Sequence, residues 1–231
     1  VVDVTTTRGG ATVSDDLINA IPGNNNFRDV MLMVGGMQAA QPPRTGNLSS
    51  ANTNFSGISY GSGTGQEAVD GLKRYSSSPP NMSAYEEVDV RTFGNTADVD
   101  APGANLQMVV KSGGNVFHGR YNDIYQRESF SSNNVTDKLR AQGIEDPDKI
   151  VYFNDLTADL GGRIVRDKLW FYANTRVADN KYTATGFVAN AGPDGRYQTG
   201  DEPPAYPTDR LRSGVVKVSY QPSAKIGRAH V

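Results

Sequence analysis

Apolar and polar residues alternate along the second half of the chain. From Leu156 to Ile164 the even-numbered positions are mostly apolar and the odd-numbered ones mostly polar, and over 169–177 the odd positions carry the apolar side chains. A polar turn, Arg166-Asp167-Lys168, separates the two runs. The pattern predicts a hairpin of two strands, each about ten residues long, with one apolar and one polar face. Residues 213–220 repeat the alternation and predict a further strand.

The connections between the expected strands differ sharply in length. The hairpin turn is short, whereas segments 130–150 and 180–209 are long, polar and rich in turn-forming residues. Short turns at one end and long loops at the other are typical of outer-membrane barrels. A soluble sandwich with one wet face gives the same alternation, and the alternation alone favours that explanation. Either architecture predicts antiparallel strands near 115–129, 152–166, 168–182 and 210–222.

The first half of the chain has shorter elements of mixed type. Ser14-Asp15-Asp16 is a plausible start for a short helix, and the apolar spacing over 27–34 predicts one face of a second helix. Strands are expected at 68–71, 86–91 and 105–110, and residues 38–66 are mostly loop-like. We therefore expect a small α+β unit before the alternating strands.

Composition narrows the class of protein. The chain has 25 Gly and 12 Pro, which favours turns over a helical bundle, and it has no Cys. With a net charge of -2, the chain lacks the excess of basic residues that is typical of nucleic-acid-binding proteins. The longest apolar run, 30–34, is far shorter than a membrane helix requires, but a membrane strand needs only about 9–11 residues.

The sequence contains no convincing motif for catalysis, for a cofactor or for a metal ion. The glycine-rich run 61–65 lacks the lysine of a phosphate-binding loop, and His118 has no His or Cys neighbour for zinc. Glu86 and Glu87 are adjacent, so they point to opposite faces of a strand and cannot form a paired-carboxylate site. We expect no enzyme activity, no cofactor and no metal.

Several ordered motifs stand out along the chain. They are Asp70 with Gly71, a run of Lys111, Ser112, Gly113 and Gly114 that continues into Asn115-Val116-Phe117-His118-Gly119, and the segment 159–172. Together they resemble the TonB-dependent transporters of bacterial outer membranes, and within them the Oar-like branch. In that resemblance the first two motifs belong to the plug and its exit, and 159–172 is the first barrel hairpin. Members of that branch usually carry a carboxypeptidase-regulatory-like domain before the plug. The signature of siderophore-type members is absent in recognisable form, which argues against an iron-siderophore substrate.

The resemblance implies a fold class and three regions. The expected fold is an α+β plug domain followed by antiparallel strands of an incomplete transmembrane β-barrel. Residues 1–114 would be the plug with a truncated N-terminus, and 115–225 the first strands of the barrel. Residues 226–231 resemble a translated sequencing adapter, so we expect an artefactual, disordered tail.

The same resemblance implies faces, partners and location. Asp155, Asp159 and Arg176 would face the barrel lumen. The expected lipid-facing residues are Leu156, Leu160, Ile164, Leu169 and Phe171. The implied function is energy-coupled uptake of a scarce solute, a small molecule, oligosaccharide or peptide, across the outer membrane of a Gram-negative-type bacterium. The implied partners are outer-membrane lipid and a periplasmic TonB-type protein whose binding box would lie upstream. A cell-surface β-rich adhesion or carbohydrate-binding protein is the alternative.

Overall fold

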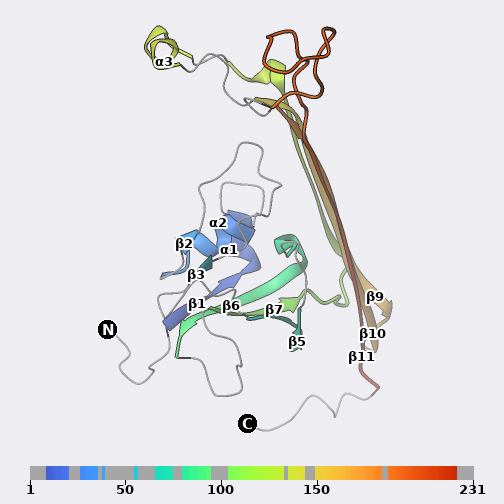
Figure 1. Cartoon of the computed structure of the whole chain (residues 1–231). Coiled ribbons are helices and arrows are strands. Elements are labelled where there is room, and N and C mark those ends of the chain that lie inside the picture. The colour runs from blue at the N-terminus through green and yellow to red at the C-terminus, as the bar shows by residue number, and fades with distance from the viewer. Residues whose placement is uncertain are drawn as a thin grey trace.

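A computed structural model describes most of the chain, and two bodies of secondary structure stand side by side in it (Figure 1). We call them the N-terminal unit and the long sheet. The predicted tail 226–231 and the glycine-rich run 61–65 lie outside the described residues. The described residues are 9–20, 27–35, 38–39, 55–56, 66–74, 80–94, 104–132, 135–143, 149–183 and 187–222.

The N-terminal unit is built on a five-stranded sheet of order β1-β6-β7-β4-β5. Neighbouring strands run antiparallel except for β4 and β7, which are parallel. A separate antiparallel pair, β2 and β3, lies beside it. The bounds are β1 Gly9–Ser14, β2 Gln38–Ala39, β3 Phe55–Ser56, β4 Gln66–Val69, β5 Leu72–Lys73, β6 Tyr85–Phe93 and β7 Asn105–Val110.

Short helices cover one face of this sheet and close its core. They are α1 (Asp15–Ala20), α2 (Phe27–Leu32) and the 3₁₀ turn η1 (Met82–Ala84). Both predicted helices are present. The Ser14 hydroxyl accepts a hydrogen bond from the Leu17 amide at the start of α1, which buries Ile18, and α2 buries Val30 and Met31 against the inward side chains of β6 and β7. The fully buried members include Ile18, Val30, Met31, Met82, Val88, Val90 and Met108.

The strand predicted over 68–71 is instead a tight hairpin. Asp70 and Gly71 form its turn with φ angles of 46° and 80°, so β4 ends at Val69 and β5 begins at Leu72. An Asp-Gly pair is the favoured sequence for two successive residues of positive φ, which explains why the chain reverses here rather than extending.

The long sheet contains four antiparallel strands in the order β11-β10-β9-β8. They lie where the alternation predicts them, and β9 is the longest at 16 residues. Figure 1 shows them projecting well beyond the N-terminal unit. Their bounds are β8 His118–Arg127, β9 Ile150–Val165, β10 Leu169–Tyr182 and β11 Thr208–Tyr220.

The two ends of the long sheet differ as their connections predict. The turn at 166–168 lies near the N-terminal unit, whereas the long segments before β9 and before β11 lie at the far end (Figure 1). The first long segment contains two short helices that the sequence pattern did not predict, η2 (Glu128–Phe130) and α3 (Asp137–Ala141). The Thr136 side chain accepts a hydrogen bond from the Leu139 amide and so caps α3.

The opposite faces of β7 provide a test of the core. We expect Met108→Ala, which empties a buried site, to lower the free energy of unfolding by about 2–5 kcal/mol. The neighbouring Val109 is 41% exposed, so Val109→Ala should change it by less than about 0.5 kcal/mol. Urea titration of the complete chain in detergent measures both, and equal losses would contradict this packing.

Candidate functional site: the contact between the two bodies

Strand register divides the side chains of the long sheet between two faces. Paired residues share a face in an antiparallel sheet, and Asp159 pairs with Asn174 while Asp155 pairs with Ala178. Asn174 hydrogen-bonds to the N-terminal unit. Asp155, Asp159 and Arg176 therefore lie on the face turned toward that unit, which we call the inner face. Whether this face lines a barrel lumen remains a prediction.

Asp155 and Arg176 form a buried ion pair across β9 and β10. The Arg176 Nε and Nη2 atoms donate to the two carboxylate oxygens of Asp155 at 2.9 and 2.6 Å. The two residues are only 2% and 6% exposed. A two-pronged contact of this kind offsets the cost of removing both charges from water, and it holds the two strands in one register.

Lys111 joins the N-terminal unit to the long sheet. Its Nζ lies 2.8 Å from the Asp15 carboxylate on α1 and 3.7 Å from the Asp159 carboxylate on β9. It also donates to the Ser83 carbonyl at 2.9 Å. Arg120 on β8 lies 3.6 Å from the same Asp15 carboxylate. Two cations and two carboxylates thus meet where the two bodies touch.

A second group of polar side chains lies beside this cluster. Asn174 accepts a hydrogen bond from the Asn81 side-chain amide at 2.6 Å and donates to the Ser83 hydroxyl at 3.2 Å. The Tyr172 hydroxyl lies 3.4 Å from both the Ser83 carbonyl and the Asp159 carboxylate. All these groups are buried or nearly so, which makes the contact rigid while it is intact.

Asp70 and Lys217 form a further contact between the N-terminal unit and the long sheet. Its side chain accepts a hydrogen bond from the Val110 amide at 3.1 Å, so it caps the end of β7. Lys217 of β11 reaches the same carboxylate at 3.2 Å and donates to the Val110 carbonyl at 2.8 Å. The Asp70-Gly71 turn therefore makes part of the contact with the long sheet.

The connection from β7 to β8 runs closely against the long sheet. A Cβ atom at Gly113 would lie 2.1 Å from the Phe171 carbonyl oxygen, so only glycine fits there. Gly114 faces open space and Ser112 is exposed, so neither of these motif residues has a comparable restriction. Asn115 holds the turn at 166–168, because its side-chain oxygen accepts from the Trp170 indole at 2.9 Å and the Asp167 amide at 3.0 Å.

The opposite face of the long sheet, which we call the outer face, carries the other half of the alternation. Its side chains range from half-buried to exposed, and Val216 reaches 76% exposure. Contact of this face with lipid remains a prediction. The predicted residues Leu156, Leu160, Leu169 and Phe171 lie on it together with Ala173, Val216 and Val218. Ile164 falls at an irregularity of β9 where Val165 pairs with Leu169, so the register does not assign it to a face.

Two groups outside the strands of the long sheet have shifted pKa values. Burial is the main cause that raises the pKa of Tyr85 at the start of β6. Backbone amides of Thr199 and Gly200 donate to the Glu202 carboxylate in the long connection before β11 and lower its pKa. Among the described residues no cluster of His, Cys, Asp or Glu is suited to a metal ion.

Sequence reasoning singled out Asp70, Lys111, Asp155, Asp159 and Arg176, but it missed three further residues that contact Lys111 or Asp70. Asp15, Ser83 and Lys217 come from three separate segments of the chain. No local pattern links them, because their contacts depend on how the two bodies meet.

Comparison with known proteins shows which class of protein the chain is similar to. The chain is 26% identical over 206 residues to the TonB-dependent transporter Oar of Myxococcus xanthus, which covers 80% of this chain and 18% of that protein. The fold resembles a solved FpvAI-pyocin S2 complex, with a TM-score of 0.51, 13% identity, and coverage of 93% of this chain and 32% of that one. The ferripyoverdine receptor of Pseudomonas aeruginosa aligns with a TM-score of 0.40, at 13% identity over 91% of this chain and 32% of that one.

Residues 109–224 match the family described as "Outer membrane beta barrel domain", and the chain belongs to that family. The resemblance to TonB-dependent transporters of the Oar-like branch is confirmed, and the protein's location is the Gram-negative outer membrane. The curated relative is named as a transporter. The chain spans less than a fifth of its curated relative. Within the described residues no helix has the length and apolarity to cross a membrane.

Two Arg–Asp pairs that differ in burial test the energetics of the inner face. We expect Arg176→Met to lower the free energy of unfolding by about 3–5 kcal/mol, because it leaves the buried Asp155 charge without its partner. Arg212 pairs with Asp179 at 2.9 Å, but its side chain is 52% exposed. Arg212→Met should therefore cost no more than about 1 kcal/mol. Denaturant titration of the complete protein in detergent compares them, and equal costs would contradict a buried inner pair.

Proposed function

We propose that the chain is part of a plugged outer-membrane transporter that takes up a scarce solute with energy supplied from the periplasm. In this proposal residues 1–114 are the plug domain and 115–225 contribute the first strands of the barrel. The inner face of the long sheet then faces the lumen, and Asp155, Asp159 and Arg176 line it. The chain carries no catalytic function.

The polarity of the contact between the two bodies is the observation that supports this proposal. Apart from some apolar packing by Tyr172 and Val215, the two bodies meet through hydrogen bonds and ion pairs. Water can replace such contacts when the surfaces separate, because polar groups that leave one another are solvated again. A plug held in this way can move without exposing a large apolar core.

The apolar outer face supports a membrane barrel over the adhesion alternative. A soluble sandwich would bury that face under a second apolar sheet. Among the described segments, none lies over Leu160, Val216 or Val218, which are at least half exposed. Lipid is the partner that satisfies such a face in an outer-membrane protein.

A periplasmic TonB-type protein would supply the force, and the cluster around Lys111 is where that force would act. Pulling on the N-terminal unit would separate Lys111 from Asp159 and Arg120 from Asp15. The solute, a small molecule, oligosaccharide or peptide, would then pass along the inner face. The long connections at the far end of the sheet would make the first contact with it, since functional contacts concentrate in loops.

A reversible bridge between the two bodies tests this function. Within these 231 residues there is no native cysteine, so Asp15→Cys with Arg120→Cys introduces one pair that a short bis-methanethiosulfonate reagent can join through two reducible disulfides, releasing methanesulfinate. In cells that express the complete transporter, uptake is read as depletion of solutes from the medium by mass spectrometry. We expect bridging to abolish uptake and reduction to restore it.

A pair within the long sheet is the matched control. Asn122 and Thr157 are paired neighbours on β8 and β9, so bridging cysteines there leaves the two bodies free to separate. Uptake should persist in that variant and stop when the inner-membrane proton gradient is collapsed. Undiminished uptake through the bridged Asp15–Arg120 pair, or uptake independent of the gradient, would contradict the proposal.

A further inference from the structure

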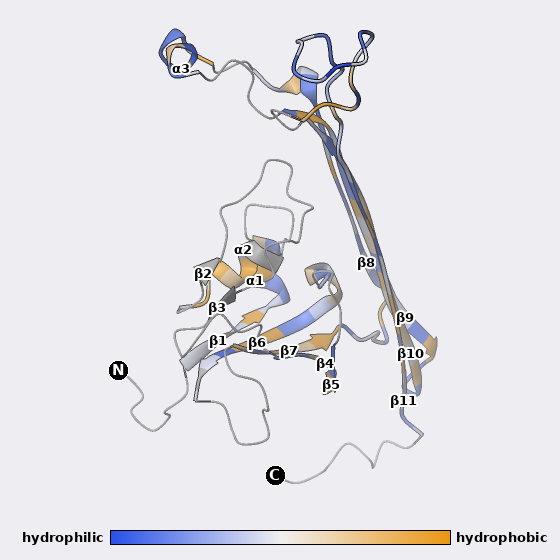
Figure 2. Cartoon of the chain, in the orientation of Figure 1, coloured by the Kyte–Doolittle hydropathy of each residue, from blue (hydrophilic) through white to orange (hydrophobic). Residues whose placement is uncertain are grey.

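The connection between β7 and β8 runs past the turn end of the long sheet. Figure 2 shows it leaving β7 and turning up into β8 beside the lower ends of β9 and β10. We call residues 113–118 the anchor segment. It begins with Gly113, which packs against the Phe171 carbonyl of the long sheet. Two residues earlier, the Lys111 amide donates to the Ala84 carbonyl of the N-terminal unit at 3.0 Å. The chain therefore passes from one body to the other between Lys111 and Gly113.

Two consecutive side chains of the anchor segment lie across a pair of glycines in β9. Gly162 pairs with Phe171 on the outer face, so Gly161 belongs to the inner face. A Cβ atom at Gly162 would lie 2.2 Å from the Phe117 ring, and one at Gly161 would lie 2.9 Å from the His118 imidazole. The anchor segment thus contacts β9 on both of its faces.

Asn115 fastens the anchor segment to the hairpin of β9 and β10. Its side-chain oxygen accepts hydrogen bonds from the Asp167 amide at 3.0 Å and the Trp170 indole at 2.9 Å. Its side-chain amide donates to the Asp167 carboxylate at 2.6 Å. Arg163 donates to the Asn115 main-chain carbonyl at 3.1 Å. One residue of the anchor segment is therefore tied to β9, to the turn and to β10.

The backbone of Asp167 shows that the turn is fitted to Asn115. The φ angle of Asp167 is 59°, in the left-handed region that glycine adopts most readily. Aspartate supplies a carboxylate that glycine lacks, and this carboxylate accepts from the Asn115 side chain. The contact with Asn115 therefore accounts for an aspartate at a position where backbone conformation alone favours glycine.

We propose that the anchor segment stays joined to the long sheet while the N-terminal unit moves, and that Asn115 is the positioning residue that holds it there. The inference rests on the function proposed above, and it places the end of the moving part at Ser112. Ser112 is exposed, so its backbone can change conformation without disturbing a packed side chain. The connection is thus divided into a fixed part after Ser112 and a movable part before it.

The two parts of the connection differ in what can replace their contacts. The anchor segment combines ring packing, a close approach of backbone and several hydrogen bonds within a few residues, and water cannot replace the packing. Lys111 meets Asp15 and Asp159 through charges that water can solvate again. A pull on the N-terminal unit is therefore resisted at the anchor segment and separates Lys111 from Asp159. Without the Asn115 contacts, the same pull would draw out the connection instead.

A bridge within the anchor tests this division by the sign of its effect. Asn115→Cys with Asp167→Cys removes the hydrogen bonds of the Asn115 side chain and allows the same bis-methanethiosulfonate reagent to join the two positions. In the reduced state the complete transporter should lose most of its uptake. Bridging positions 115 and 167 should restore uptake, whereas bridging Asp15→Cys to Arg120→Cys should abolish it.

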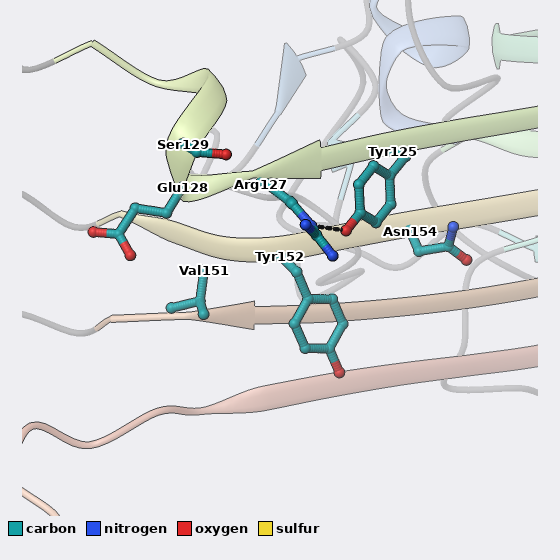
Figure 3. Close-up of a pocket in the computed structure, with 7 residues that line it drawn as sticks. All are labelled: Tyr125, Arg127, Glu128, Ser129, Val151, Tyr152 and Asn154. Atoms are coloured by element: carbon teal, nitrogen blue, oxygen red, sulfur yellow. Dashed lines mark hydrogen bonds between the residues drawn. The ribbon is translucent and has the colours of Figure 1, made fainter.

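Amide hydrogen exchange of the resting transporter in detergent reads the anchor without transport. Asn115→Ala should speed exchange in peptides that cover 113–118 and 166–170 about tenfold, because the hydrogen bonds that protect them are lost. Tyr125→Phe is the matched control at the opposite end of β8. It removes the hydroxyl that accepts from Arg127 beside the pocket shown in Figure 3, and exchange at 113–118 should stay unchanged.

Three results would overturn the anchor. They are loss of uptake on bridging positions 115 and 167, full uptake by the reduced form of that variant, and unchanged exchange in Asn115→Ala. The proposed function fails on a different result, which is uptake that persists when positions 15 and 120 are bridged. In that case the exchange measurement still decides whether Asn115 holds the segment to the long sheet.

Discussion

The alternation of side chains along extended strands is the constraint on which the other features depend. Successive residues of a strand must point to opposite faces, so β9 and β10 present every second side chain to each of two environments. One face carries the buried Asp155–Arg176 pair and the contacts with the N-terminal unit. The other carries an apolar band that Thr175 interrupts. A slip of one residue in register would exchange the two sets and leave buried charges without partners.

The N-terminal unit fits this sheet through a few polar groups and one close approach of backbone. Lys111 and Asp70 stand at the two ends of the contact, and Gly113 lets the connecting segment lie against the Phe171 carbonyl. This packed connection joins the two bodies covalently. In the function proposed above, it would hold the plug to the barrel while their side-chain contacts change.

Local pattern predicted the elements whose formation depends on nearby residues. All four long strands follow from period-two alternation, and α1 and α2 follow from caps and helical spacing. The hairpin at Asp70 was missed because four apolar and turn-forming residues read equally as a strand. The helix α3 was missed because it is one turn long and is stabilised by a single cap at Thr136. Asp15 and Lys217 could not be assigned, since their partners are distant in sequence.

In the orientation proposed above, one face of the long sheet lies in lipid while the other meets the N-terminal unit. Because these 231 residues contain no cysteine, nitroxide labels can be placed singly along β11 from Ser213 to Tyr220 in the complete protein in lipid vesicles. Collision with lipid-soluble oxygen should be high at Val216 and Val218 and low at Ser213 and Ser219, with a period of two residues. Equal collision rates at odd and even positions, or access of a water-soluble chelate to Val216 and Val218, would contradict the account.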